Sequence, residues 1–172
     1  MLFRSWGTWS SGSSGQVIAG SNSSSGSVSI YTSGIQRFQI DSSGYVTLPN
    51  QPCFRAQRTT SFIISAATEI AFNSILFNIS SSYNSTTGRF TAPVSGRYYF
   101  HASLQAVTSS ISNTINFYVN GVSVQYMANG WTISQPARGD ISVSGILNLS
   151  AGDYVSVYAT SSSSGKIGRA HV

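Results

Sequence analysis

The chain has 172 residues, of which 41% are hydrophobic, 12% aromatic and only 8% charged. This length and apolar content suffice for one domain plus an extension, and the abundance of Ser, Gly, Thr and Asn favours strands and turns over helices. The formal net charge of +5 comes from scattered rather than clustered basic residues, which argues against a nucleic-acid interface. Cys53 is the single cysteine, which excludes an intrachain disulfide.

Both ends of the chain can be encoded by library-adapter DNA. Residues 1–5 and 167–172 have coding strings that are reverse complements over most of their length, and both match a common short-read adapter. We therefore expect residues 1–5 and 166–172 to be translated adapter rather than natural termini. The alternative is that both peptides are genuine and the match is a coincidence. No apolar run is long enough for a signal peptide or a membrane span, so we expect no membrane insertion.

Residues 6–52 form a Ser/Gly-rich segment with strand signals in its second half. Residues 6–29 contain too few apolar side chains to fold alone. Strand-type residues then alternate with turn sequences, and Pro49 and Pro52 mark a boundary. The expected short strands are 27–31, 35–40 and 45–48, split by Thr32-Ser33-Gly34 and by Asp41-Ser42-Ser43-Gly44.

From Cys53 onward, strand signals recur at short spacing between Gly, Ser, Asn and Pro breaks. The predicted strands are 54–58, 63–65, 75–78, 88–91, 96–107, 114–120, 122–128, 140–149 and 153–160. Asn120-Gly121 between apolar segments is the strongest hairpin signal in the chain. Many short strands with regular turn signals predict a β-sandwich or barrel.

Alternation along the longer strands predicts which side chains face the core. Tyr98, Phe100, Ala102 and Leu104 share one face of their strand, and the intervening residues, Tyr99 and His101 among them, point the other way. The same reasoning assigns to the core Val143, Gly145, Leu147, Leu149, Val155, Val157 and Ala159.

Several ordered motifs between residues 53 and 165 resemble the complement C1q-like domain. A Phe stands before a Pro-x-x-Gly-x-Tyr-x-Phe strand at Phe90 and 93–100, and a Leu-x-x-Gly-Asp turn ends at Asp153. Further matches are Ile70-Ala71-Phe72, Phe77-Asn78 and Tyr118-Val119-Asn120-Gly121. The resemblance implies an all-β jelly roll of two packed sheets that assembles as a homotrimer, like tumour-necrosis-factor-like proteins.

The sequence departs from that family at its end. The family's last strand is usually rich in aromatic residues and should follow Ser164, but no such segment is present. We therefore expect the last strand to be missing. An unpaired sheet edge and an uncovered core would then make the chain poorly soluble or partly unfolded, and a sharp melt of a monodisperse trimer would contradict this.

A second resemblance concerns the segment in front of the domain. Residues 38–46 and 48–52 resemble a segment common just before the terminal domain of phage tail fibres. The alternative interpretation is an ordinary β-hairpin, because such Asp-Ser-Ser-Gly turns occur in other β-rich proteins.

Catalytic and metal-binding groups are sparse. His101 and His171 are the only histidines, and the four acidic residues are spread singly, so we expect neither an enzyme nor a cofactor. Some C1q-like trimers bind calcium in their loops. Here only Asp140 and Asp153 could supply carboxylates, and Asp153 suits a turn better, so we expect no metal site.

The candidate contact residues are Tyr126, Met127, Trp131, Arg138 and Tyr99. The first three lie in or near a loop before Pro136, where aromatic side chains suit sugars and protein surfaces, and Arg138 opens an Arg-Gly-Asp tripeptide. Burial at a trimer axis is an equal alternative for the aromatic residues.

These observations favour a structural and adhesive protein over an enzyme. Our first hypothesis is the receptor-binding tip of a trimeric phage tail fibre or virion appendage, located on the virion, whose loops bind a host-surface protein or glycan through avidity. The alternative is an extracellular, secreted C1q-like ligand or cell-adhesion module from a bacterium or animal, with the Ser/Gly-rich segment as a flexible linker.

Overall fold

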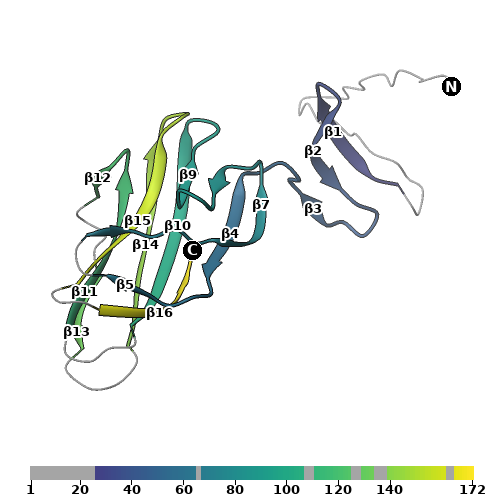
Figure 1. Cartoon of the computed structure of the whole chain (residues 1–172). Helices are drawn as coiled ribbons and strands as arrows, with labels where there is room; N and C mark the ends of the chain where they lie inside the picture. Colours follow the sequence, from purple (N-terminus) through teal and green to yellow (C-terminus); the bar gives the residue numbers. More distant parts are fainter. Residues whose placement is uncertain (1–25, 65–66, 107–110, 125–128, 134–138, 162–164) are drawn as a thin grey trace, which may run out of the picture. The chain divides into compact units, whose positions relative to one another are not determined.

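A computed structural model of the whole chain describes residues 26–64, 67–106, 111–124, 129–133, 139–161 and 165–172 (Figure 1). Strands β1–β16 contain all the regular secondary structure of these residues, and no helix occurs among them. The chain divides into two compact units, Met1–Gln51 and Pro52–Val172. Across the described residues, no helix of sufficient length and hydrophobicity to span a membrane is found.

The N-terminal unit contains a three-stranded antiparallel sheet in the order β1-β2-β3. Its strands are β1 (Val28–Thr32), β2 (Ile35–Ile40) and β3 (Val46–Thr47), close to the predicted segments. Ser33 and Gly34 join β1 to β2 with φ angles of 51° and 73°, the left-handed conformation of a tight hairpin turn.

The predicted turn at Asp41 joins β2 to β3. The Asp41 Oδ1 atom accepts hydrogen bonds from the backbone N–H groups of Ser43 and Tyr45, both at 2.9 Å. Gly44 has φ +86° and donates its N–H to the Asp41 carbonyl at 3.0 Å. The short Asp side chain therefore replaces backbone partners in a turn that needs a glycine at its end.

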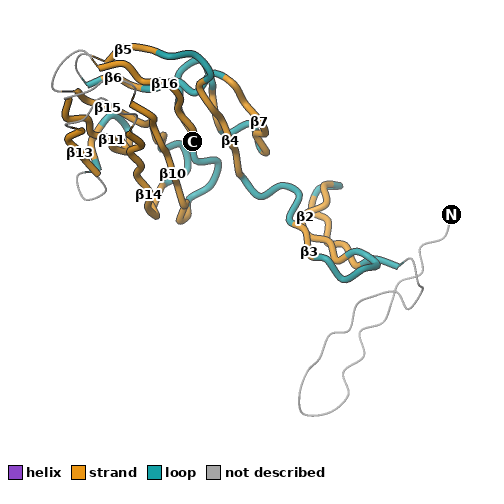
Figure 2. The backbone as a smooth tube through the Cα atoms, turned by 90° about the horizontal axis from the view of Figure 1, so that it is seen from below, coloured by secondary structure: helices purple, strands orange, loops and turns teal. Residues whose placement is uncertain are grey.

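The C-terminal unit is a sandwich of two mostly antiparallel sheets (Figure 2). The six-stranded sheet has the order β14 (Gly139–Leu149), β10 (Gly96–Ala106), β16 (Gly165–His171), β4 (Cys53–Arg58) and β7 (Ser74–Ile79), with β5 (Phe62–Ile64) beside β16. The seven-stranded sheet has the order β12 (Val122–Ser123), β11 (Ile111–Val119), β15 (Tyr154–Ser161), β9 (Arg89–Thr91) and β8 (Tyr83–Asn84), with β13 (Asn129–Ile133) beside β11 and β6 (Thr68–Glu69) beside β15.

Apart from the short hairpins β8–β9 and β11–β12, most neighbouring strands in each sheet are far apart in the chain, which is the connectivity of a jelly roll. The predicted fold class is thereby confirmed. Asn120 and Gly121 form the predicted β11–β12 turn, with φ angles of 51° and 80°.

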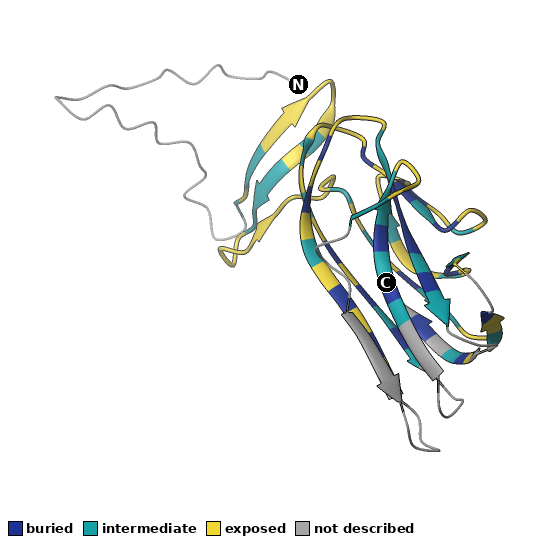
Figure 3. Cartoon of the chain, turned by 90° about the vertical axis from the view of Figure 1, so that its left-hand side faces the viewer, coloured by how far each residue is buried: buried dark blue, intermediate teal, exposed yellow. Residues whose placement is uncertain are grey.

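The core lies between the two sheets, and alternation along their strands supplies it (Figure 3). Phe100, Ala102 and Leu104 are buried on β10, and Tyr98 packs partly buried against them, as predicted. Of the other residues predicted for the core, Gly145 is only half-buried, and the buried ones are Val143, Leu147, Leu149, Val155, Val157 and Ala159.

Aromatic side chains contribute much of this packing. The ring centroids of Phe90 and Phe100 lie 5.3 Å apart in an edge-to-face arrangement, and those of Phe100 and Phe117 lie 5.8 Å apart. Phe54 stacks on Tyr83 with a centroid distance of 4.5 Å.

The expected absence of the last strand is wrong. Strand β16 lies between β10 and β4, pairing His171 with Ser103 and Ala170 with both Leu104 and Arg58. Ile167 and Ala170 of this strand are fully buried, so an aliphatic and a small side chain face the core where an aromatic segment was expected. β16 covers β10 only from Ser103 to Ala106. The adapter origin of these residues stays a prediction.

Four strands were not predicted from the sequence: β6, β8, β13 and β16. Strands β6 and β8 have two residues each, too few to show an alternating pattern. Strand β13 lies in a segment where a loop was expected, and its pairing with β11 is a tertiary contact.

Candidate binding surfaces

The outward face of the six-stranded sheet carries an exposed apolar pair. Tyr99 on β10 lies directly opposite Ile146 on β14, and their side chains are 69% and 62% exposed. The flanking outward pairs are polar, namely Arg97 with Asn148 and His101 with Ser144. Two large apolar side chains thus stand together on an otherwise polar part of the sheet.

His101 lies on this face without the partners of a catalytic triad. It is exposed and opposite Ser144, whereas Asp140 lies opposite Gln105, further along the same pair of strands. Within the described part of the chain, no three His, Cys, Asp or Glu side chains gather as metal ligands would. The expected absence of a metal or cofactor stays a prediction.

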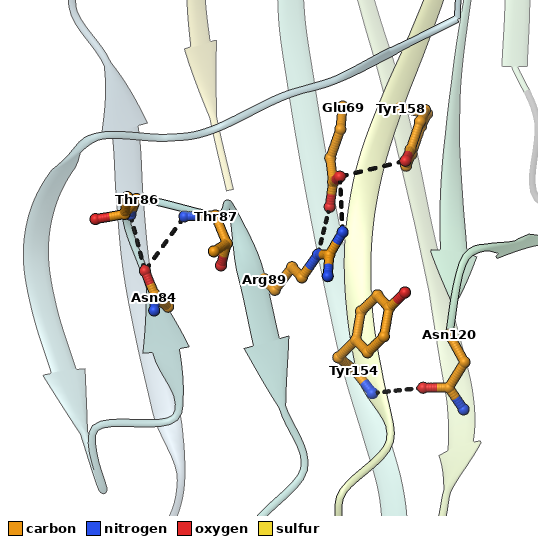
Figure 4. A network of polar contacts seen from close by, with 8 residues as sticks. All are labelled: Glu69, Asn84, Thr86, Thr87, Arg89, Asn120, Tyr154 and Tyr158. Atoms are coloured by element: carbon orange, nitrogen blue, oxygen red, sulfur yellow. Dashed lines mark hydrogen bonds and ion pairs between the residues drawn. The ribbon is translucent and has the colours of Figure 1, made fainter.

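The outward face of the seven-stranded sheet carries a polar network (Figure 4). The Arg89 guanidinium donates from Nε to Glu69 Oε1 at 2.8 Å and from Nη2 to Glu69 Oε2 at 3.1 Å. The Tyr158 hydroxyl donates to Glu69 Oε2 at 3.2 Å. The hydrogen bonds from Arg89 hold the pKa of Glu69 below its ordinary value despite partial burial of the carboxyl. Burial and the nearby carboxylate raise the pKa of Tyr158.

Tyrosine rings surround this ion pair. The Arg89 guanidinium carbon lies 4.4 Å from the ring centroid of Tyr154, and the rings of Tyr118 and Tyr158 stack with centroids 4.0 Å apart. Since Glu69 neutralises Arg89, the group formed by Glu69, Arg89 and these tyrosines offers aromatic rings and hydroxyl groups with its two charges paired. Such a combination suits a neutral polar ligand better than an anion.

The loop before β9 sets the position of Arg89, which is the first residue of that strand. Asn84 Oδ1 accepts hydrogen bonds from the N–H groups of Thr86 and Thr87 at 2.9 and 3.2 Å (Figure 4). Gly88 follows with φ +76°, and a Cβ atom there would lie 2.5 Å from the Ile70 carbonyl oxygen. Only glycine fits this close approach, which sets Arg89 at the head of its strand.

Asp153 serves the turn before β15. Its Oδ1 accepts from Asn120 Nδ2 at 2.8 Å and its Oδ2 accepts from the Ser150 N–H at 2.8 Å, which lowers its pKa. Asn120 Oδ1 in turn accepts from the Tyr154 N–H at 3.0 Å (Figure 4). Both carboxylate oxygens of Asp153 are therefore engaged in the turn, as its sequence context indicated.

Most of the predicted contact residues lie in parts of the chain that the structure does not describe. Tyr126, Met127 and Arg138 lie outside the described residues. The backbone of Trp131, which was expected in or near a loop, belongs to strand β13 and lies opposite Asn113 on β11. Likewise Gly139 and Asp140 already belong to β14, so two residues of the Arg-Gly-Asp tripeptide lie in a strand.

Sequence reasoning missed the network around Glu69 and Arg89. The alternation that assigned Val155, Val157 and Ala159 to the core also places Tyr154 and Tyr158 on the opposite face, so the tyrosine surface could have been found. The Arg89–Glu69 pair could not, because its partners are on separate strands.

Comparison with known proteins identifies relatives of the C-terminal unit. The family model of the C1q domain matches residues 53–171. Complement C1q tumor necrosis factor-related protein 5 of Rattus norvegicus is 28% identical over 128 residues, which are 66% of this chain and 50% of that protein. The chain thus spans about half the length of this curated relative.

Solved structures that resemble the chain include the following two. The globular domain of zebrafish complement 1qA protein has a TM-score of 0.56 at 19% identity, covering 71% of this chain and 96% of that one. Murine APRIL has a TM-score of 0.48 at 11% identity, covering 69% of this chain and 98% of that one.

Proposed function

Because this chain belongs to the C1q domain family, whose members are generally non-enzymatic ligand-binding modules that form homotrimers, we propose that it is an extracellular, homotrimeric adhesion module. The observation that carries the proposal is the family match over residues 53–171. The similarity to a complement C1q tumor necrosis factor-related protein supports the extracellular location.

The Tyr99–Ile146 pair supports self-association of the domain. Both side chains are more than half exposed, and they lie opposite each other on a sheet whose other face is core. Interfaces between identical copies are enriched in aromatic residues such as tyrosine and are more apolar at their centre than the rest of the surface. Covering this pair in a trimer would remove it from water, so we assign Tyr99 to trimer contact.

The tyrosine surface of the seven-stranded sheet supports ligand binding. Tyr118, Tyr154 and Tyr158 offer ring edges and hydroxyls around the neutralised Arg89–Glu69 pair. Aromatic rings beside polar hydrogen-bonding groups suit the apolar and hydroxyl faces of a neutral sugar. The ligand class we propose is therefore a neutral glycan, bound weakly at three sites and strongly through avidity.

Sedimentation velocity and a glycan array test these two surfaces separately. We expect the wild-type chain to sediment as a trimer and the Tyr99→Ser/Ile146→Ser variant to sediment as a monomer, because the apolar contact is lost. Val122→Ser, at a residue that is also 69% exposed but on β12, is the matched control and should stay trimeric. A monomeric wild-type chain would refute the trimer.

On the array, Tyr118→Ala should lose glycan binding while it remains a trimer. The monomeric variant should bind about 10²–10⁴ times more weakly than wild type through lost avidity. Binding to immobilised proteins but to no glycan would redirect the proposal to a protein ligand.

A phage tail-fibre tip is the second candidate function. The observation that favours it is that a β-sheet unit, rather than a collagen-like repeat, precedes the domain. Long-read sequencing across the coding locus tests it. Neighbouring virion genes would support the fibre, whereas a signal peptide without virion genes would support the secreted module. The same sequencing tests the adapter origin of the two terminal peptides, which contiguous native DNA encoding both of them would refute.

A further inference from the structure

The small N-terminal sheet is amphipathic. Residues opposite each other in an antiparallel ladder share a face, and the register pairs Val28 with Ile40, Ile30 with Phe38, and Ile40 with Val46. These five residues form one face, here called the apolar face. The other face carries the pairs of Ser29 with Gln39 and Gln39 with Thr47, together with Tyr31 opposite Gln36.

Nothing in the described structure buries the apolar face. Ile30 and Val46 are 55% and 59% exposed, and Val28, Phe38 and Ile40 are half-buried. No residue between 26 and 51 reaches the burial of a core residue. An amphipathic sheet normally buries its apolar face against a second layer.

The N-terminal sheet needs such a covering layer at all times in order to stay folded. Strands β1, β2 and β3 have five, six and two residues, and so short a sheet is marginally stable in water without packing. A ligand that comes and goes would leave the sheet without support for most of the time. The covering partner should therefore be present at a fixed ratio to this chain.

We propose that the apolar face packs against the same face of other copies of this chain, so that residues 26–51 form a self-associating stalk. This inference rests on the proposed trimer. Strand β3 ends at Thr47 and strand β4 of the C1q domain unit begins at Cys53, so only residues 48–52 separate the two sheets in the chain, and assembly of the domains would hold the N-terminal sheets at high effective concentration.

Charge also favours identical partners. Arg37 and Asp41 are the only charged residues between 26 and 51, and neither belongs to the apolar face. Copies of the face can therefore meet without repulsion between like charges and without burying an unpaired charge. The polar face with Ser29, Gln39 and Thr47 remains for solvent.

Cysteine crosslinking tests the proposal in the full chain. In a Cys53→Ser background, Val46→Cys places a thiol on the apolar face, and its chain neighbour Thr47→Cys places one on the polar face. Both residues are exposed on strand β3, which makes them a matched pair. We expect a short bis-maleimide to crosslink copies several-fold more through Val46→Cys. Adding Phe38→Ser should abolish that difference, whereas Gln39→Ser should keep it.

The possible results distinguish a failure of the proposed stalk from a failure of the proposed trimer. A trimer in sedimentation with equal crosslinking at the two positions would overturn the stalk and leave the trimer intact. The stalk would also be overturned if the Val46→Cys thiol were protected from a mono-maleimide but formed no crosslinks between copies. In that case another part of the same chain would cover the apolar face. A monomer would overturn the trimer itself, and crosslinks specific to Val46→Cys in a dimer would support the stalk while contradicting the trimer.

Discussion

The N-terminal sheet and the C-terminal sandwich use the same local pattern with opposite results. In both units, apolar residues alternate with polar ones and opposite residues share a face. The sandwich has a second sheet, and there Phe72 and Phe117 are fully buried. The N-terminal sheet has one layer, and Ile30 remains 55% exposed. A patterned sheet gains stability only when something covers it.

The largest expected difference between the two units concerns core phenylalanines. Phe117→Ala should reduce the free energy of unfolding of the sandwich by about 3–5 kcal/mol, because the lost ring leaves a cavity between the sheets. Phe38→Ala in the N-terminal sheet should leave the same transition almost unchanged. Urea unfolding of the full chain, followed by tryptophan or circular dichroism signals, measures both. Equal losses of unfolding free energy in the two variants would show that the two units unfold together, and the contrast between the covered and the uncovered sheet would then be wrong.

Glycine substitutions should separate close packing from turn geometry. Gly88→Ala and Gly44→Ala both place a side chain at positive φ, +76° and +86°, which costs roughly 1–2 kcal/mol. At Gly88 the new Cβ would also lie 2.5 Å from the Ile70 carbonyl oxygen, whereas at Gly44 it meets nothing within 4 Å.

We therefore expect Gly88→Ala to lower the melting temperature of the sandwich clearly and to reduce soluble yield. Gly44→Ala should leave that transition in place. A Gly88→Ala variant as stable as wild type would mean that the Asn84–Gly88 loop moves away from Ile70 at little cost.

Removing a buried hydroxyl group should reduce the free energy of unfolding by a smaller amount. The Tyr83 hydroxyl donates to the Phe72 carbonyl and accepts from the Phe72 N–H, both at 3.1 Å, and burial raises its pKa to about 12. Tyr83→Phe leaves both backbone groups without this partner and should cost about 1–3 kcal/mol in urea unfolding. Tyr45→Phe, at a tyrosine that is 71% exposed in the N-terminal unit, is the control and should be neutral.

The Glu69–Arg89 pair should give the smallest effect, visible mainly as a pH dependence. The folded state lowers the pKa of Glu69 from 4.5, so the carboxylate stabilises the fold above that value, and this contribution disappears as the pH falls through the lowered pKa. Glu69→Gln should melt slightly below wild type at neutral pH and converge with it in acid. A constant difference at every pH would indicate a packing effect instead, and added salt should reduce an electrostatic one.

The family motifs predicted the jelly roll well, since they record a fold that many sequences share. The segment Phe90–Phe100 and the turn at Asp153 lie where the resemblance requires them, on β9–β10 and before β15. The surfaces were harder to predict. Tyr99 was assigned to the outward face correctly, whereas Trp131 was expected in or near a loop and lies in a strand that the tertiary structure pairs with β11.

By itself, the sequence determined the all-β class, the inward faces of β10, β14 and β15, and the turns at Asp41 and Asn120. These features depend on alternation and on φ preferences, which act within a few residues. Only the tertiary structure decided that 165–171 complete the six-stranded sheet and that Arg89 meets Glu69 and Tyr158. Those contacts join residues from separate strands, and their formation depends on strand order and register across a whole sheet.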